Sequence, residues 1–262
     1  MSILKSEAIV LYSQRQGETS KRLQLYSKEY GKLGVIVKGS QSIKARHWGS
    51  LETLSYIEAV FYYKSGRPLH YIKQASIIHA FPSLHSELGK WALAAIPLEI
   101  VNRTQEPEDS NSYLFDLLLK TLCTLEKNEK GLKNIIRAFE LHMVSDAGFK
   151  PSLTRCDHCS NETEALYWHF LIKRGVLRCS QCGTLERESL KISTDARKAL
   201  NWLMAVSIPD SPTVLLPGKL GKEIDHILYA FLEAHLESMN NLKSVRALEA
   251  MQKNLQQNQN SR

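Results

Sequence analysis

The sequence predicts an α+β protein in which a small five-stranded barrel is followed by a helical domain that carries a four-cysteine ribbon. Three observations lead to this class. Residues 1–80 contain short runs rich in Val, Ile and Tyr between polar turns, which is typical of strands. Beyond residue 80 the apolar residues recur with the period of a helix. Two Cys-x-x-Cys pairs then lie at residues 156–159 and 179–182.

The strand-like runs predict a closed or half-closed barrel, because they follow one another at intervals of roughly ten residues. The runs are residues 7–14, 23–31, 32–39, 53–64 and 69–78. A polar, basic loop, "KGSQSIKARHWGS", separates the third run from the fourth. A small basic barrel of this kind is the usual form of an OB-fold. We therefore assign residues 1–80 to an OB-fold that binds nucleic acid.

Helical periodicity covers most of the remaining chain, at residues 84–104, 111–128, 131–148, 194–206 and 219–237. Pro97 should kink or split the first of these helices, since proline has no amide hydrogen. Asn111 or Ser112 should cap the second helix, and Thr194 should cap the fourth. The predicted divisions are a helical domain at 81–150, a zinc ribbon insert at 151–186, helices that complete the helical domain at 187–250, and a disordered tail at 251–262.

Positive charge is concentrated at the start of the chain. The net charge is +7; residues 1–80 hold twelve Lys or Arg and five Glu, whereas residues 81–262 hold 22 basic and 22 acidic residues. This asymmetry makes the first domain a candidate for binding a polyanion. A solvated basic face, a membrane surface or an acidic protein is also compatible with charge alone. No long apolar run and no signal peptide is visible, so we expect a cytoplasmic protein without a membrane partner.

The four paired cysteines, Cys156, Cys159, Cys179 and Cys182, predict a metal site. Each Cys-x-x-Cys pair forms a knuckle, a tight turn that places two sulfurs on one side, and the knuckles are separated by 19 residues. Four thiolates complete the tetrahedral shell of Zn²⁺, and this spacing lies in the range of four-cysteine zinc sites. We therefore predict one structural zinc ion per chain.

Other roles for the cysteine segment fit less well. A redox pair would need a βαβ unit, and a catalytic zinc ion would need an open coordination position. His158 and His169 are possible substitute ligands, but His158 lies inside a knuckle and is expected to face solvent. Cys123 is interpreted as a small buried apolar residue. The basic residues between the knuckles are interpreted as a solvated hairpin tip rather than phosphate contacts; they are Lys173, Arg174 and Arg178.

The basic barrel holds the two ingredients of a site for single-stranded nucleic acid, which are cations and flat aromatic rings. The candidate DNA-binding residues are Arg15, Lys21, Arg22, Lys38, Lys44, Arg46, His47 and Trp48. Binding of this kind should be independent of sequence and strongly dependent on salt. No nucleotide-binding loop, nucleophile elbow or paired-carboxylate motif is visible, so we do not expect an enzyme.

Five segments, in order along the chain, form a distinctive set. They are "QGETSKRLQLYSKEYGKLGVIVKGSQSIKAR", "HAFPSL", "RAFELHMVSDAGFKPSLTRCDHC", "RGVLRCSQC" and "NLKSVRAL". Together they resemble the bacterial RecO recombination-mediator family, and the resemblance covers nearly the whole chain. The first segment and the junction between "FELHMVSDAGFKP" and "CDHC" are its most specific parts.

The resemblance implies an N-terminal OB-fold, a helical domain and a zinc site of four cysteines, which some members lack. It implies DNA repair by the RecF pathway, with binding of single- and double-stranded DNA and annealing of complementary strands. It also implies that the protein works with RecR, and often RecF, to load RecA onto DNA coated by single-strand-binding protein. The C-terminal tail of that coating protein is a further implied partner. The implied location is the cytoplasm, in association with the nucleoid.

Two functions from other classes compete with this interpretation. A zinc-ribbon regulator of transcription should have a basic recognition helix, which the expected helices lack. A zinc-dependent hydrolase should have an open metal position, which four cysteines would close.

Overall fold

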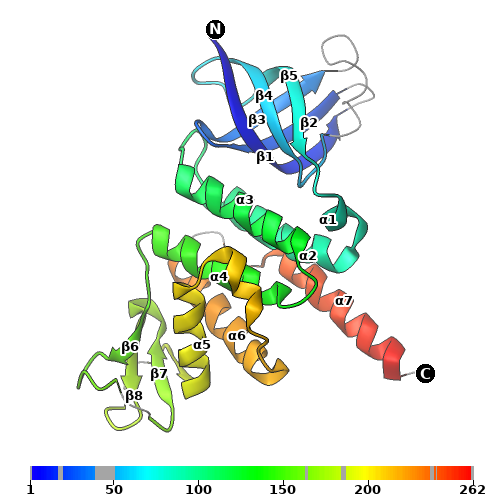
Figure 1. Ribbon diagram of the computed structural model, residues 1–262. Helices are drawn as coiled ribbons and strands as arrows, with labels where there is room; N and C mark the ends of the chain where they lie inside the picture. Colours follow the sequence, from blue (N-terminus) through cyan, green and yellow to red (C-terminus); the bar gives the residue numbers. More distant parts are fainter. Residues whose placement is uncertain are drawn as a thin grey trace. The chain divides into compact units, whose positions relative to one another are not determined.

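The computed structural model describes residues 2–16, 20–38, 51–162, 165–183, 187–236, 239 and 241–260, with the backbone alone for 252–260. The chain divides into two compact units (Figure 1). The barrel unit contains Met1–Lys127 and Asn241–Arg262, and the ribbon unit contains Asn128–Asn240. This division separates helices that the sequence places together in one helical domain.

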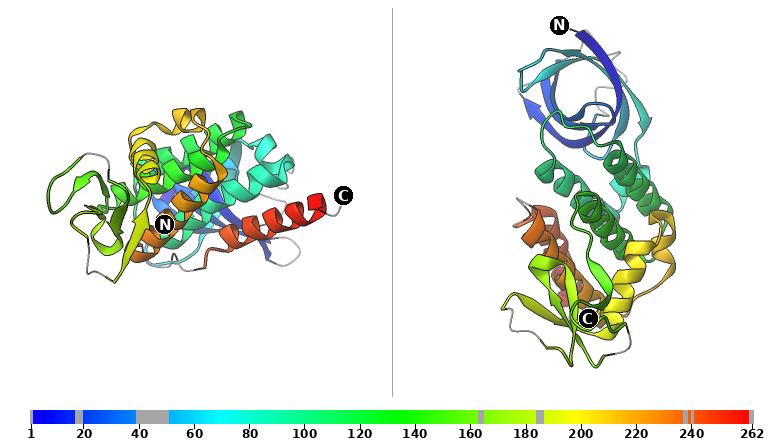
Figure 2. Two further views of the ribbon diagram at one scale, coloured as in Figure 1. Left: turned by 90° about the horizontal axis from the view of Figure 1, so that it is seen from below. Right: turned by 90° about the vertical axis from the view of Figure 1, so that its left-hand side faces the viewer.

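Five strands close into a barrel. They are β1 (Ser2–Gln16), β2 (Ser20–Ser27), β3 (Gly31–Lys38), β4 (Tyr56–Tyr63) and β5 (His70–His79). Their order is β1-β2-β3-β5-β4, with β4 paired to β1 and with β3 and β5 parallel. The right-hand view of Figure 2 shows the closed sheet as a ring. The predicted five-stranded barrel is confirmed.

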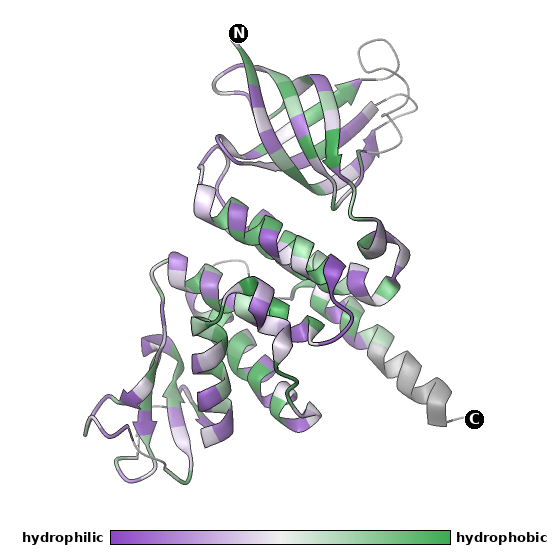
Figure 3. Ribbon diagram, viewed as in Figure 1, coloured by the Kyte–Doolittle hydropathy of each residue, from purple (hydrophilic) through white to green (hydrophobic). Residues whose placement is uncertain are grey.

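Apolar side chains fill the interior of the barrel. They alternate with polar side chains along each strand, because successive side chains point to opposite faces of the sheet. Leu23, Leu25, Val35 and Val37 take the inward positions of β2 and β3 and are fully buried, and Phe61 of β4 packs into the same core. Figure 3 shows hydrophobic and hydrophilic residues alternating along these strands. The outward positions are therefore available for polar and aromatic side chains.

Three helices follow the barrel: α1 (Pro82–Ser86), α2 (Leu88–Thr104) and α3 (Ser112–Lys127). Pro97 lies inside α2 and does not split it. The reason is packing, since α2 contacts α1, α3 and β1 and this burial outweighs one missing hydrogen bond. Asn111 is the cap of α3, because its Oδ1 accepts from the amide of Leu114 at 2.9 Å.

Helix α7 (Lys243–Asn260) completes the barrel unit by packing on α2. Glu99 of α2 caps α7, since its carboxylate accepts from the amides of Lys243 at 3.0 Å and Ser244 at 2.7 Å. Burial raises the pKa of Glu99, but these bonds and the nearby Arg103 outweigh it and lower that pKa. The sequence predicts a disordered tail at 251–262, whereas α7 extends to Asn260, because its capped first turn supplies the costly helix nucleus.

The ribbon unit combines helices with a four-stranded sheet of order β6-β8-β7-β9. The helices are α4 (Leu132–Asp146), α5 (Thr194–Ala205) and α6 (Gly218–His235). The strands are β6 (Ser152–Cys156), β7 (Trp168–Leu171), β8 (Val176–Cys179) and β9 (Ser189–Ile192). The short 3-10 turns are η2 (Ile172–Arg174) and η3 (Ile208–Thr213). Ser193, rather than Thr194, caps α5, because its Oγ accepts from the amide of Ala196 at 3.0 Å.

Candidate nucleic-acid interface and metal centre

A row of outward-facing residues crosses all five strands of the barrel. The strand register aligns Gln14 with Arg22, Arg22 with Ile36, Ile36 with Tyr71, and Tyr71 with Tyr62. Arg22 is exposed, and the Tyr71 side chain is 38% exposed. Neighbouring strands lie about 4.8 Å apart. These residues, the outer row, therefore form one continuous surface that carries one cation, Arg22, and two aromatic rings, Tyr71 and Tyr62.

Two predicted DNA-binding cations, Arg22 and Lys38, lie on or beside the outer row. Arg22 is exposed, and no ion pair is found for it within the part of the chain that the structure describes. Arg15 is also exposed, but the register aligns it with Lys21, on the other face of the sheet near the end of β1. Lys38 is also exposed, and its Nζ lies 4.9 Å from the centre of the Tyr71 ring, a cation–π contact. Exposed cations beside an aromatic ring are the combination that binds single-stranded nucleic acid without reading its sequence.

Lys21 is directed away from the outer row. It is 5% exposed, and its Nζ lies 2.6 Å from Glu52 Oε1. The period of two along β2 places Lys21 on the same inward side as Leu23 and Leu25. A buried, paired ammonium group is poorly placed to contact phosphate. The other predicted DNA-binding residues lie outside the described residues; they are Lys44, Arg46, His47 and Trp48.

The structure adds exposed cations that the sequence did not single out, at Lys64, Arg67 and Lys73. Lys64 and Arg67 lie in the loop between β4 and β5, which passes so close to β3 that a Cβ on Gly34 would be 2.7 Å from the carbonyl oxygen of Pro68. This loop and the β2–β3 face bind oligonucleotides in OB-folds. The only sign of this extra positive charge in the sequence is the pair of basic residues in the turn "KSGRP". The approach of this loop to β3 depends on the long-range closure of the barrel and is not visible in the sequence.

The four paired cysteines meet at the ends of β6 and β8. Cys156 and Cys179 end these strands and are buried, whereas Cys159 and Cys182 follow on the knuckle turns. All four Sγ atoms lie within 4.8 Å of one another, and those of Cys159 and Cys179 are 3.8 Å apart. Tetrahedral zinc with bonds of about 2.3 Å holds its sulfurs roughly 3.8 Å apart. The donor set and the spacing therefore fit a zinc ion, and within the described residues no histidine joins the cluster.

The pKa values of these thiols are shifted in opposite directions. Burial raises the pKa of Cys156, but amide hydrogen bonds from Cys159, Cys179 and His158 outweigh it and lower that pKa to about 6. Hydrogen bonds to the Cys159 and Cys179 sulfurs raise the pKa of Cys182 to about 12. Four sulfurs this close cannot all be ionised by themselves, because like charges repel. The cluster is suited to exchange its protons for a divalent cation.

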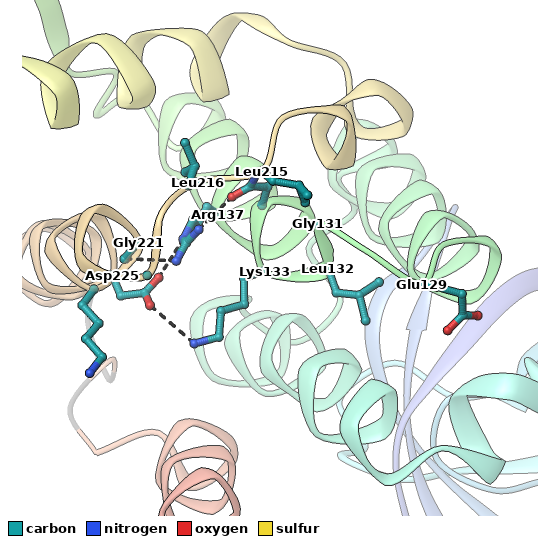
Figure 4. A pocket seen from close by; sticks show the side chains of 12 residues that line it. Glu129, Gly131, Leu132, Lys133, Arg137, Leu215, Leu216, Gly221 and Asp225 are labelled. Atoms are coloured by element: carbon teal, nitrogen blue, oxygen red, sulfur yellow. Dashed lines mark hydrogen bonds and ion pairs between the residues drawn. The ribbon is translucent and has the colours of Figure 1, made fainter. Parts of the chain in front are cut away.

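A pocket of about 470 Å³ lies within the ribbon unit, between the first turns of α4 and α6 and the segment before α6 (Figure 4). Leu132, Leu215 and Leu216 line it with apolar groups. Its charged lining is mixed, with the cations Lys133, Arg137 and Lys222 and the carboxylates Glu129 and Asp225. Both helices begin at this pocket, and helix N-termini favour anions. The pocket therefore suits a ligand that has both an apolar part and a negative charge.

Arg137 fixes one wall of this pocket (Figure 4). It is 5% exposed, and its Nε donates to Asp225 Oδ1 at 2.7 Å. Its Nη1 donates to Asn134 Oδ1 at 2.7 Å, and its Nη2 donates to the carbonyl of Gly221 at 3.0 Å. Arg137 thus joins α4 to α6 as a structural residue. Asp225 also pairs with Lys133, whose Nζ lies 3.8 Å from Oδ2 (Figure 4), so that Lys222 is the lining cation for which the described residues show no ion pair.

Two family models match this chain. "Recombination protein O N terminal" matches residues 1–81. "Recombination protein O C terminal" matches residues 85–246, which is more than half of the 262 residues. The chain belongs to the RecO family. The RecO resemblance of the sequence is thereby confirmed, and the first match ends just beyond β5, the last strand of the barrel.

Curated relatives of this RecO-family chain include several proteins named "DNA repair protein RecO". The one from Alkaliphilus metalliredigens is 31% identical over 238 residues, 91% of this chain and 96% of that protein. The one from Acetivibrio thermocellus is 28% identical, with 94% and 98% covered. The one from Bacillus pumilus is also 28% identical, with 94% and 97% covered. Among the described residues of this RecO-family chain, no helix is long and apolar enough to cross a membrane.

Proposed function

We propose that this RecO-family DNA repair protein binds single- and double-stranded DNA through the outer row of its barrel and anneals complementary strands. The observation that supports this most directly is the exposed combination of Arg22, Lys38 and Tyr71 on adjoining strands. Lys64 and Arg67 extend the positive surface along the neighbouring loop. Such a surface attracts the phosphate backbone whatever the base sequence.

The proposed mechanism of annealing rests on charge and stacking. Cations along one strand release its counterions and reduce its repulsion of a second strand. An exposed ring such as Tyr71 contacts the flat face of a base, which leaves the pairing edge of that base accessible. A strand held in this way is neutralised and still able to pair, so that a complementary strand can join it.

We further propose that the chain works with RecR, and with RecF as an additional partner, to help load RecA onto DNA coated by single-strand-binding protein. The metal centre has a structural role in this scheme and would hold zinc. Four sulfur ligands leave no position for a water molecule, which argues against a zinc-dependent hydrolase. A sheet surface, rather than a basic recognition helix, argues against a transcription regulator.

The pocket between α4 and α6 is the proposed site for the C-terminal tail of the single-strand-binding protein. The end of any chain carries a carboxylate, and Lys222 and two helix N-termini offer it positive charge. Leu215 is 64% exposed and Leu216 lies beside it in the lining, so that apolar tail residues would find contacts. Docking the coating protein in this way would raise the local concentration of the barrel near coated DNA.

The DNA-binding proposal is tested by titrating a labelled single strand, bare and coated, at a series of salt concentrations. Three or more phosphate contacts, each adding about 0.7 to the logarithmic salt slope, predict at least a tenfold loss of affinity between about 50 and 200 mM salt. Annealing of a complementary strand should slow in parallel. Affinity that does not change with salt, or an annealing rate equal to that without protein, would contradict the proposal.

The pocket proposal is tested with a fluorescent peptide that matches the last ten or so residues of the coating protein from the same genome. Lys222→Glu should weaken its binding by roughly tenfold, since one favourable charge becomes repulsive. The control Lys198→Glu changes the same charge on α5, and amidating the C-terminus of the peptide should mimic Lys222→Glu. Equal affinities for the two variants would place the tail elsewhere without affecting the DNA-binding proposal.

A further inference from the structure

The first knuckle contains a largely buried carboxylate that is not a member of the sulfur cluster. Asp157 follows Cys156, and its side chain is 12% exposed. Arg178 holds it with two bonds, from Nε to Oδ1 at 2.9 Å and from Nη2 to Oδ2 at 3.0 Å. Nη2 of Arg174 also lies 3.0 Å from Oδ2. Both carboxylate oxygens are therefore bound by guanidinium groups.

This ion pair links the two halves of the metal centre. Asp157 lies inside the first knuckle, and Arg178 immediately precedes Cys179 in the second, 21 positions along the chain. The amide of Asp157 donates to the carbonyl of Leu177 at 2.8 Å, which brings β6 and β8 together at the same point. The sequence places Arg178 on a solvated hairpin tip, but its side chain is only 21% exposed because Asp157 binds it.

We propose that Asp157, Arg178 and Arg174 form a clamp that positions the two knuckles for a metal ion and slows its release, without binding the ion. Closing a loop of about twenty residues costs conformational entropy, and the clamp lowers that cost by holding the two knuckles together. The planar guanidinium of Arg178 fixes both the distance and the angle of the carboxylate, because it binds in two places. This role is separate from the proposed binding of DNA and does not depend on it.

A second ion pair in the same sheet provides a matched control. Lys173 Nζ lies 2.9 Å from Glu188 Oε2, and the two side chains are 70% and 59% exposed. Exposed pairs of this kind contribute little, and Lys173 stands one residue before Arg174. Loss of the exposed pair should therefore leave the metal centre unchanged, whereas loss of the clamp should not.

The test measures how fast zinc leaves the full-length, zinc-loaded protein when a colorimetric chelator is added in excess. Asp157→Asn and Arg178→Gln are each expected to release zinc about 10 to 100 times faster than the wild type, because loss of groups that orient metal ligands lowers metal affinity by about that factor. Arg178→Lys keeps the charge but not the two-point contact, so its rate should be intermediate. Lys173→Gln should match the wild type.

A parallel measurement separates positioning from simple loss of structure. The Co²⁺-substituted Arg178→Gln protein should keep the absorption bands of a tetrahedral four-thiolate site, because all four ligands remain. Release rates within twofold of the wild type for both Asp157→Asn and Arg178→Gln would overturn the clamp, as would equal acceleration in Lys173→Gln. If Asp157→Asn cannot be purified folded, the order of rates for Arg178→Gln, Arg178→Lys and wild type decides the matter.

Discussion

Cys156→Ser or Cys179→Ser is expected to unfold the cysteine ribbon and to reduce the solubility of the protein. The strands β6 to β9 have only five, four, four and four residues. Trp168 and Phe170 of the sheet are buried, but, among the described residues, the two knuckles at its end have no strand pairing of their own to hold them together. Structural zinc contributes on the order of 10 kcal/mol to the folding of such modules. A serine hydroxyl does not replace a thiolate ligand, and most of this free energy would be lost.

This prediction is checked by the zinc content of the purified variants and by limited proteolysis, with cleavage expected within residues 151–192. Treating the wild type with chelator should give the same new fragments. The barrel should remain resistant, because it has its own hydrophobic core. Cys123→Ser, on α3 in the barrel unit, removes a thiol outside the cluster and should retain zinc. A soluble, protease-resistant, metal-free Cys156→Ser/Cys179→Ser protein would show that the site is dispensable.

Reversing Arg22 and Lys38 together to Glu is expected to lower the affinity for single-stranded DNA on the order of a hundredfold at about 0.1 M salt. Two phosphate contacts would be lost and two repulsive charges added at the outer row. The logarithmic salt slope should also fall by about 1.4, because each contact to a single strand contributes about 0.7. Both side chains are exposed, so the melting temperature should change little.

The matched control is Lys130→Glu with Lys219→Glu, two exposed positions of the ribbon unit. This double variant changes the net charge by the same amount. Its two positions lie far along the sequence from the residues of the outer row. Binding and melting curves for the two double variants distinguish a site from a general charge effect. Equal losses of affinity in both variants would rule out the outer row as the binding surface.

Much of the barrel is predictable from local pattern, and its functional surface is only partly so. The alternation of Leu23 and Leu25 with Arg22 already places Arg22 outward and Lys21 inward, so that the burial of Lys21 follows from the period of two. Its partner Glu52 lies 31 positions away, and no local pattern reveals it. The approach of the β4–β5 loop to Gly34 likewise depends on the closure of the whole barrel.

The clustering of the four paired cysteines was predictable because their spacing reports a chemical requirement directly. The clamp of Asp157, Arg178 and Arg174 could not be predicted from the sequence, since a charged residue near a predicted turn is usually solvated. Only the pairing of β6 with β8 brings Asp157 to Arg178. Pro97 is a third case: its missing hydrogen bond is visible in the sequence, whereas the packing that keeps α2 intact is not.

The capping of α7 by Glu99 has a consequence for how the protein is made. The barrel unit is built from two stretches of chain, and the ribbon unit is encoded between them. During synthesis, Glu99 cannot form its bonds to the amides of Lys243 and Ser244 until these residues have left the ribosome. By then the whole ribbon unit has been synthesised. The four paired cysteines therefore emerge from the ribosome before α7, and the last helix of the barrel unit docks only after the whole ribbon unit has been synthesised.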